Sequence, residues 1–313
     1  MSELNNVASI SIASVPVDGA LSQVVLGSAA DPTLAVWFDG ALRRPPSELD
    51  GVTMLEVLNG WDDSGAMIRA ALDDVPPDPA ALVDAHVVAP VTYPPAVICA
   101  GANYVDHFEE MGIPRPAAPP PPFFFLKPPT TTVIGDGAPI RMPAGDDVRL
   151  DWEGELAIVI AHRVRDLSAD QVGDHIAGYT IANDISARGS FRRSAPLAPP
   201  FAFDWLGHKG RDGSCPVGPA LVPAHLVGDP QNLRIRTWVN GELVQDSTTA
   251  EMYVPIADLV AAVSQTMTLS PGDVILTGTP AGVGSPRGRF LDVGDSVSVS
   301  IDGLGTLTNH IVR

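Results

Sequence analysis

Residues 151–160 read Asp-Trp-Glu-Gly-Glu-Leu-Ala-Ile-Val-Ile. The apolar, β-prone second half predicts a strand, and Asp146 and Asp147 mark a loop before it. Side chains alternate across a strand, so we expect Glu153 and Glu155 on one face, roughly 7 Å apart. Two carboxylates at this spacing repel each other unless a cation lies between them. The stretch therefore predicts a cation site at the mouth of a buried strand.

The chemistry of the two acids favours a hard cation. Carboxylate oxygens suit Mg²⁺, Mn²⁺ or Ca²⁺ better than zinc. The alternative is a solvated edge strand with two ordinary surface acids, Glu153 and Glu155, because the Glu-x-Glu pattern alone is weak. A hard metal site also needs a third oxygen ligand, and Asp184 follows the apolar stretch that ends at Asn183. Asp184 could equally cap the turn that follows, with Ser186 behind it, and both alternatives stay open.

Composition narrows the class of protein. The chain has 313 residues, of which 45% are hydrophobic and 18% charged, as in ordinary globular proteins. We see no apolar run long enough for a membrane span and no secretory signal at the N-terminus. The two cysteines, Cys99 and Cys215, do not form a disulfide framework and favour a reducing, cytoplasmic location. A lone-thiol nucleophile is a less favoured alternative.

The net charge of −18 argues against nucleic acid as a partner, because phosphate binding needs clustered Lys and Arg. An anionic small substrate stays compatible with this charge, since local cations can make a positive pocket in a negative protein. The 31 prolines and 29 glycines, with few long helical patterns, predict a β-rich, loop-rich fold rather than a helical bundle.

The order of patterns along the chain predicts two regions. Residues 1–90 read as a small α/β module without a cluster of catalytic residue types, and residues 91–313 read as a β-rich catalytic region. Within the module we expect a strand and turn at 35–40, helices at 54–58 and 66–72, and helix breakers at 73–79. Within the second region we expect a buried strand at 96–101, a short helix at 103–112, an extended proline-rich spacer at 116–122, a strand at 123–128, a hairpin at 234–244 and a helix at 256–263.

A second possible chemical group lies on the predicted short helix. His107 and Glu110 are three residues apart, so they share a helix face, and Glu110 could orient the imidazole as a general base. The alternative is a surface histidine beside a surface acid. The other histidines have no comparable partner and are interpreted as structural or surface residues: His86, His162, His175, His208, His225 and His310.

Two lysines and one glycine-rich turn could bind an anion. Lys127 ends an apolar run of phenylalanines, and Lys209 lies in a glycine-rich cationic loop. Surface placement is the alternative for each lysine. The amides and hydroxyls of Thr277–Gly284 could receive a carboxylate, although the sequence of this stretch by itself favours a plain turn without a ligand.

The order of these stretches resembles the fumarylacetoacetate hydrolase family over about residues 95–312. The matching stretches are GANYVDHFEEMG, FFLKP, DWEGELAIVI, GYTIANDISAR, HKGRDGSCPVGP, VNGELVQDSTTAEM and LSPGDVILTGTPAGVG. The resemblance implies an α+β, β-rich fold, a mixed β-sandwich roll with a small N-terminal α/β module. It also implies a homodimer that binds Mg²⁺ or Mn²⁺.

The resemblance also implies roles for individual residues. Glu153, Glu155 and Asp184 fall on the family's metal carboxylates, and His107 with Glu110 falls on the catalytic pair of a lid helix. The other expected site residues are the pocket lysines Lys127 and Lys209 and the substrate contacts Tyr104, Arg188, Gly278 and Thr279.

Three departures from the family pattern concern the substrate pocket. Ala102 replaces a basic residue that is common in acylpyruvate-cleaving members. Gly189 and Phe191 replace an acid and an amide, and a proline-rich insert precedes Phe123. Together these departures lead to the hypothesis of a bulkier or less charged substrate.

These observations predict a divalent-metal hydrolase that cleaves a carbon–carbon bond in a β-dicarbonyl or 2,4-dioxo compound, with water activated by His107 and Glu110. The alternative enzyme is a 2-oxo acid decarboxylase or a keto–enol isomerase or hydratase. A metal-binding carrier or an inactive interaction protein is the alternative from another class, although a mere binder needs no base such as His107.

Overall fold

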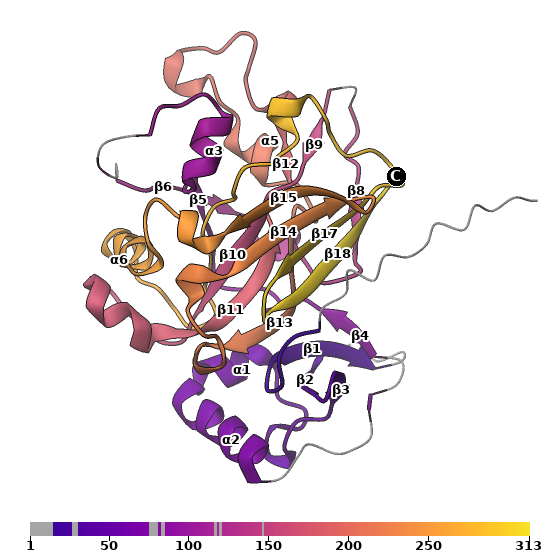
Figure 1. The fold of residues 1–313 in the computed structure, drawn as a ribbon, viewed down its shortest axis with the longest axis vertical. Helices are drawn as coiled ribbons and strands as arrows, with labels where there is room; N and C mark the ends of the chain where they lie inside the picture. Colours follow the sequence, from indigo (N-terminus) through magenta and orange to yellow (C-terminus); the bar gives the residue numbers. More distant parts are fainter. Residues whose placement is uncertain are drawn as a thin grey trace, which may run out of the picture.

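A mixed eleven-stranded sheet forms the body of the protein in the computed structural model (Figure 1). The structure describes residues 15–26, 31–74, 81–82, 85–115, 118, 121–145 and 147–313. The sheet order is β3-β2-β1-β13-β11-β10-β16-β5-β6, with β4 beside β1 and β7 beside β13. Its strands are β1 Leu21–Leu26, β2 Thr33–Phe38, β3 Ala41–Arg43, β4 Ala85–Val88, β5 Val97–Gly101, β6 Phe123–Lys127, β7 Val133–Ile134, β10 Gly154–Ile160, β11 Ile176–Asn183, β13 Cys215–Pro223 and β16 Val274–Leu276.

A five-stranded sheet packs against this body in the order β15-β14-β17-β18-β8, and β12 pairs with β9 beside it. Its orange and yellow strands lie across β10 and β11 in Figure 1. These strands are β8 Pro139–Arg141, β9 Leu150–Asp151, β12 Ser186–Ala187, β14 Arg234–Val239, β15 Glu242–Thr248, β17 Ser296–Ile301 and β18 Gly305–Val312. Both large sheets mix parallel and antiparallel pairs, and this confirms the predicted β-rich α+β class.

Strand β10 lies inside the large sheet, between β11 and β16, and all seven of its residues are buried. A continuous apolar run is typical of a strand covered on both faces, so its sequence explains its position. The alternative of a solvated edge strand is wrong. The predicted strand start at Asp151 needs correction, since Trp152 and Glu153 lie between β9 and β10, and β10 begins at Gly154. A side chain at Gly154 would overlap Thr237 of the facing sheet, so glycine lets the two layers approach closely.

The α-helices are α1 Met54–Asn59, α2 Trp61–Asp74, α3 Val105–Glu110, α4 Pro129–Thr132, α5 Trp205–Lys209 and α6 Ile256–Thr266. Helix α1 begins with a capping box, in which the Thr53 hydroxyl accepts from the Glu56 amide and the Glu56 carboxylate accepts from the Thr53 amide. Helix α3 occupies the predicted short helical segment and stops before Gly112, whose φ of 68° favours glycine. Within the described residues, no helix is long and apolar enough to cross a membrane.

The N-terminal strands and α1 and α2 form the lower part of the molecule in Figure 1. Strand β1 joins this part to the large sheet, because Leu21 pairs with Leu221 of β13. The predicted strand and turn at 35–40 and both predicted helices are present. The domain boundary near residue 90 stays a prediction. Four residues of the proline-rich spacer (116, 117, 119 and 120) and most of the breaker cluster (75–79) lie outside the described residues.

Candidate functional site

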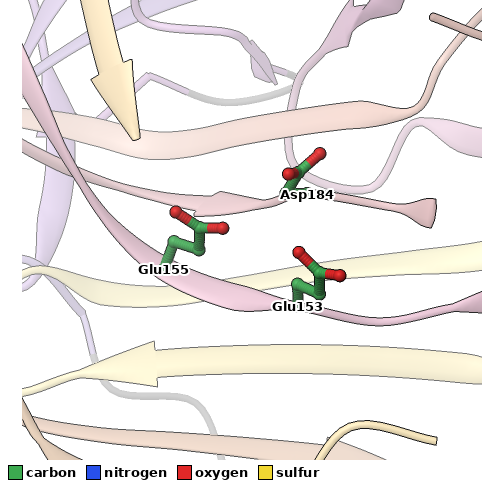
Figure 2. Close-up of side chains that lie close together, drawn as sticks. All are labelled: Glu153, Glu155 and Asp184. Atoms are coloured by element: carbon green, nitrogen blue, oxygen red, sulfur yellow. The ribbon is translucent and has the colours of Figure 1, made fainter. Parts of the chain in front are cut away.

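Three carboxylates from neighbouring strands converge at one end of the large sheet. Glu153 directly precedes β10, Glu155 lies within it, and Asp184 directly follows β11. The two strands are in register there, and the Asp184 amide donates to the Glu153 carbonyl oxygen at 2.8 Å. One ligand atom from each carboxylate lies within 4.8 Å of the other two. Figure 2 shows Glu153 and Glu155 on one ribbon and Asp184 on the next, with their carboxylates gathered together.

Three cations lie against these carboxylates. The Lys209 ammonium donates to Glu153 at 2.8 Å and to Asp184 at 2.7 Å. Lys127 forms a short ion pair with Asp184 and also donates to the carbonyl oxygen of Ile185. The Arg188 guanidinium lies 2.5 Å from Glu153. Neither lysine is at the surface, because both are almost fully buried. The role of each lysine toward a substrate stays a prediction.

The cations contact Glu153 and Asp184, and the pKa values of Glu153 and Glu155 are shifted in opposite directions. Burial opposes ionisation of Glu153, but the charges of Lys209 and Arg188 outweigh it and lower the pKa of that carboxyl group. Burial, and then repulsion from Asp184 and Glu153, raises the pKa of Glu155 well above its usual value. The Gly278 amide donates to Glu155 at 2.6 Å. Burial works against the Lys209 charge, yet Asp184 and Glu153 raise the pKa of this lysine.

This donor set fits a hard divalent cation. Three buried carboxylates supply oxygen ligands of the kind that Mg²⁺ and Mn²⁺ prefer. Burial, together with repulsion from Asp184 and Glu153, raises the pKa of Glu155, and the positive charge of a bound cation would oppose both effects. As candidate metal ligands, Glu153, Glu155 and Asp184 are therefore brought together as predicted, whereas their occupancy stays a prediction.

Asp151 lies beside this cluster and holds it in place through hydrogen bonds, a role that the sequence does not indicate. Its carboxylate accepts from the amides of Gly284 and Ser285 at 2.7 and 3.0 Å. It also accepts from Arg188 at 2.9 Å, so it holds the guanidinium that contacts Glu153. The contacts with Gly284 and Ser285 join positions more than 130 residues apart, and the acids next to Asp151 in the sequence do not indicate them.

His107 and Glu110 form the predicted pair on α3. The Nδ1 atom of His107 lies 3.2 Å from Oε2 of Glu110, and His107 is only 8% exposed. The alternative of a surface pair is therefore wrong. A positive charge on His107 would help to lower the pKa of Glu153, so the pair lies near this carboxyl group. Because Nδ1 faces an acceptor, Nε2 is the ring nitrogen that can accept a proton.

Three of the four predicted substrate contacts, Gly278, Thr279 and Arg188, already have polar partners within the protein. The Gly278 amide donates to Glu155, and the Thr279 hydroxyl donates to the Gly154 carbonyl oxygen at 2.9 Å. Arg188 binds two acids, and Tyr104 is fully buried in the main core. Direct contact of these four residues with a substrate stays a prediction. The geometry shows that Gly278, Thr279 and Arg188 fix the walls of the carboxylate site.

An aromatic wall stands beside the cations. Phe191 packs on His208, with ring centroids 4.3 Å apart, and also contacts Trp205. Gly189 is required nearby, because a side chain there would overlap the Asp147 backbone. Phe191 therefore gives the site region an aromatic side, and its effect on the choice of substrate stays a prediction.

His208 belongs to the site region, although the sequence placed it among structural or surface histidines. It is 2% exposed, and burial, followed by the Lys209 charge, lowers its pKa to about 4. The neutral ring must donate from Nδ1 to the Ala187 carbonyl oxygen, 3.1 Å away. Its Nε2 is therefore an acceptor.

A cavity of about 260 Å³ borders the Phe108 side of α3. The departure residue Ala102 lines it and adopts a φ of 48°. The other lining residues are Ala100, Gly101, Asn103, Phe108, Ile113, Pro121, Pro122, Phe123, Tyr253, Val254 and Leu259. All of these side chains are uncharged.

Known proteins share both the fold and the order of these residues. Residues 96–312 match the family model for the fumarylacetoacetate (FAA) hydrolase C-terminal domain. The chain belongs to the fumarylacetoacetate hydrolase family. This membership confirms the resemblance inferred from the seven sequence stretches and the mixed β-sandwich roll that it implied.

Relatives in this family carry different activities. Oxaloacetate tautomerase fahd2, mitochondrial, of Xenopus laevis is 42% identical over 229 residues, which cover 72% of this chain and 68% of the relative. The crystal structure of 2-hydroxyhepta-2,4-diene-1,7-dioate isomerase from Mycobacterium marinum is 33% identical in sequence, with a TM-score of 0.69. The match covers 94% of this chain and 98% of the isomerase chain. The crystal structure of maleylpyruvate hydrolase from Sphingobium sp. SYK-6, in complex with manganese (II) ion and pyruvate, is 27% identical in sequence, with a TM-score of 0.73. The match covers 94% of this chain and 98% of the hydrolase chain.

Proposed function

We propose that the chain is a divalent-metal-dependent keto–enol tautomerase or isomerase of a 2-oxo dicarboxylate of the oxaloacetate type. The His107–Glu110 pair on α3, on the side of the buried carboxylates, carries this proposal, because it supplies a base where an enolate would form. The 42% identity with an oxaloacetate tautomerase over 72% of the chain supports the same reaction. This proposal replaces hydrolysis as the favoured reaction, and it replaces the hypothesis of a bulkier or less charged substrate.

The proposed metal ligands are Glu153, Glu155 and Asp184, and the cation is Mg²⁺ or Mn²⁺. When bound, such a cation would polarise the oxygens of a 2-oxo carboxylate. Lys209 and Lys127 both form ion pairs with Asp184, and Lys209 together with Arg188 lowers the pKa of Glu153, so cationic side chains offset the charge of two of the three proposed ligands.

The chain's own groups can move the proton. The substrate's C3–H bond breaks, and Nε2 of His107 accepts the proton while Glu110 stabilises the imidazolium through Nδ1. The same proton, or one exchanged with water, then passes to the oxygen at C2, so the ketone becomes its enol without gain or loss of atoms. In the reverse direction, the imidazolium returns the proton to C3.

Hydrolysis of a carbon–carbon bond is the second candidate. A water molecule deprotonated by His107 would attack a carbonyl carbon, and the bond to the enolate fragment would break. The likeness to maleylpyruvate hydrolase with manganese and pyruvate favours this reaction.

The homodimer and the cytoplasmic location both stay predictions, and the Xenopus laevis relative carries the word mitochondrial in its name.

Product analysis separates the reactions. Oxaloacetate, acetylpyruvate and a bulky aryl β-diketone would each be incubated with Mg²⁺, with Mn²⁺ and with EDTA, and followed by NMR. The proposal predicts metal-dependent interconversion of keto and enol oxaloacetate without new compounds. Two fragments from a diketone would support the hydrolase instead, and release of CO₂ with pyruvate would identify a decarboxylase. Turnover that persists in EDTA would contradict the metal requirement.

A further inference from the structure

Helix α3 is attached to the loop after β16 by two carboxylates one helical turn apart. Oδ1 of Asp106 accepts from the Ala281 amide at 3.2 Å, and its Oδ2 accepts from the Ser247 hydroxyl at 2.7 Å. Oε1 of Glu110 accepts from the Gly282 amide at 3.0 Å. Adjacent amides of one loop thus bind both ends of the helix.

Apolar packing covers only part of the surface of α3. The helix has six residues, too few to be stable without tertiary contacts. Phe108 and Ile113 border the cavity of about 260 Å³, so part of this face has no packed core behind it. The polar contacts of Asp106 and Glu110 add to the apolar contacts of this helix, in which Val105 and Phe108 are buried and Phe108 packs against Tyr253.

The two carboxylates have different tasks. Glu110 uses Oε1 for the Gly282 amide and Oε2 for His107, so one side chain both attaches the helix and orients the base. Among the residues that the structure describes, the Asp106 carboxylate accepts from the Ala281 amide and the Ser247 hydroxyl, and both of these contacts attach the helix. It precedes His107 directly in the chain. Loss of Asp106 would leave α3 attached through Glu110, about which the helix could pivot.

We propose that Asp106 is a positioning residue that fixes His107 relative to the carboxylate site through Ala281 and Ser247. This inference rests on the proposed function for its effect on turnover, because His107 is the base there. A displacement of about 1 Å at a catalytic group can reduce a rate about 100-fold. The attachment itself, however, can be measured without turnover.

The test combines amide hydrogen exchange of residues 104–112 with kinetics of the metal-loaded enzyme. Asp106→Ala should speed exchange of this segment at least about 10-fold and lower kcat about 10- to 100-fold, with KM changed far less. Asp106→Asn should stay within about 3-fold of wild type, because its amide oxygen can accept from Ala281 and its NH₂ group can donate to Ser247. Glu109→Ala removes an exposed acid of the same helix and is the control.

Each outcome decides a separate point. Unchanged exchange in Asp106→Ala overturns the attachment, whatever the activity. Faster exchange with unchanged kcat overturns the positioning role. If the wild type shows no tautomerase activity, hydrogen exchange still tests the attachment, so failure of the proposed function is distinguishable. If Asp106→Ala unfolds, Ser247→Ala removes one contact only, and exchange and kcat equal to wild type in that variant would overturn the proposal.

Discussion

Glu155 is the least compensated charge of the candidate metal site. Glu153 and Asp184 each contact two cationic side chains, whereas Glu155 accepts the Gly278 amide and faces the two other carboxylates. Burying a charge without an opposite partner is costly, so the metal-free protein carries an electrostatic penalty at this residue. The penalty is the reason to expect a cation here.

Glu155→Gln removes this negative charge and keeps the shape of the side chain. We expect the metal-free variant to melt about 2–6 °C above the metal-free wild type, because repulsion by Asp184 and Glu153 is relieved. The variant should also lose the rise in Tm that Mn²⁺ gives the wild type. Thermal melts with MnCl₂ and with EDTA measure both effects. Glu251→Gln, at an exposed acid, is the control, and a full metal-induced rise in Glu155→Gln would exclude Glu155 as a ligand.

The loop after β16 is the element that joins the carboxylate site to α3. Its Gly278 amide contacts Glu155, and its Gly282 amide contacts Glu110. Gly282 has a φ of 108°, and a Cβ there would overlap the Val244 carbonyl oxygen. The close approach to β15 and the backbone conformation both require glycine.

Gly282→Ala should lower the free energy of unfolding by at least about 2 kcal/mol, because strain and steric overlap add. Gly288→Ala is the matched control in the same loop region, since Gly288 has a φ of 65° and open space around it. That control should lose only about 1 kcal/mol. Urea unfolding of both variants measures the difference. Equal losses would contradict the tight contact at Val244.

The turn before β16 carries a pH-sensitive carboxylate. Burial raises the pKa of Asp273 from 3.8 to about 6, although the Ser270 amide donates to it at 2.7 Å. The folded protein therefore binds this proton more tightly than the unfolded chain. Its contribution to stability is full below about pH 4 and is lost as the pH rises through about 6.

Asp273→Asn mimics the protonated acid at every pH. We expect the variant to melt about 2–4 °C above wild type at pH 8, and this difference should shrink toward pH 4.5. Melting curves at both pH values give the comparison, with Asp258→Asn, an Asp of α6 without a buried carboxylate, as the control. A difference that grows as the pH falls would contradict the sign of this argument.

Secondary-structure elements were predictable from the sequence where the local residue types decide them. The Asn240-Gly241 turn, with φ values of 52° and 80°, formed the expected hairpin between β14 and β15. Alternation also placed Glu153 and Glu155 together, although Glu153 precedes the strand. The contacts of Asp106 and Asp151 were not predictable, because their amide partners lie more than 130 residues away and no side-chain pattern marks a backbone donor.

At the scale of the whole molecule, the mixed β-sandwich roll was predictable, because seven stretches typical of the family occur along the chain in the family's order. It did not predict how the chain supplies cations to an acidic site in a protein of net charge −18. Lys127 at the end of β6, Arg188 after β12 and Lys209 at the end of α5 meet only through the tertiary fold. The local sequence around each of these residues was also compatible with a position at the surface or with a contact to the substrate.

The whole assembly can be tested by following enol-to-ketone conversion of oxaloacetate in D₂O by NMR, with Mg²⁺-loaded wild type and Mg²⁺-loaded His107→Asn. Metal binding to both proteins would be verified by calorimetry. We expect fast, metal-dependent conversion with deuterium at C3 in the wild type, and a loss of about 100-fold or more in the variant at unchanged metal affinity. Conversion by His107→Asn at the wild-type rate would contradict this expectation.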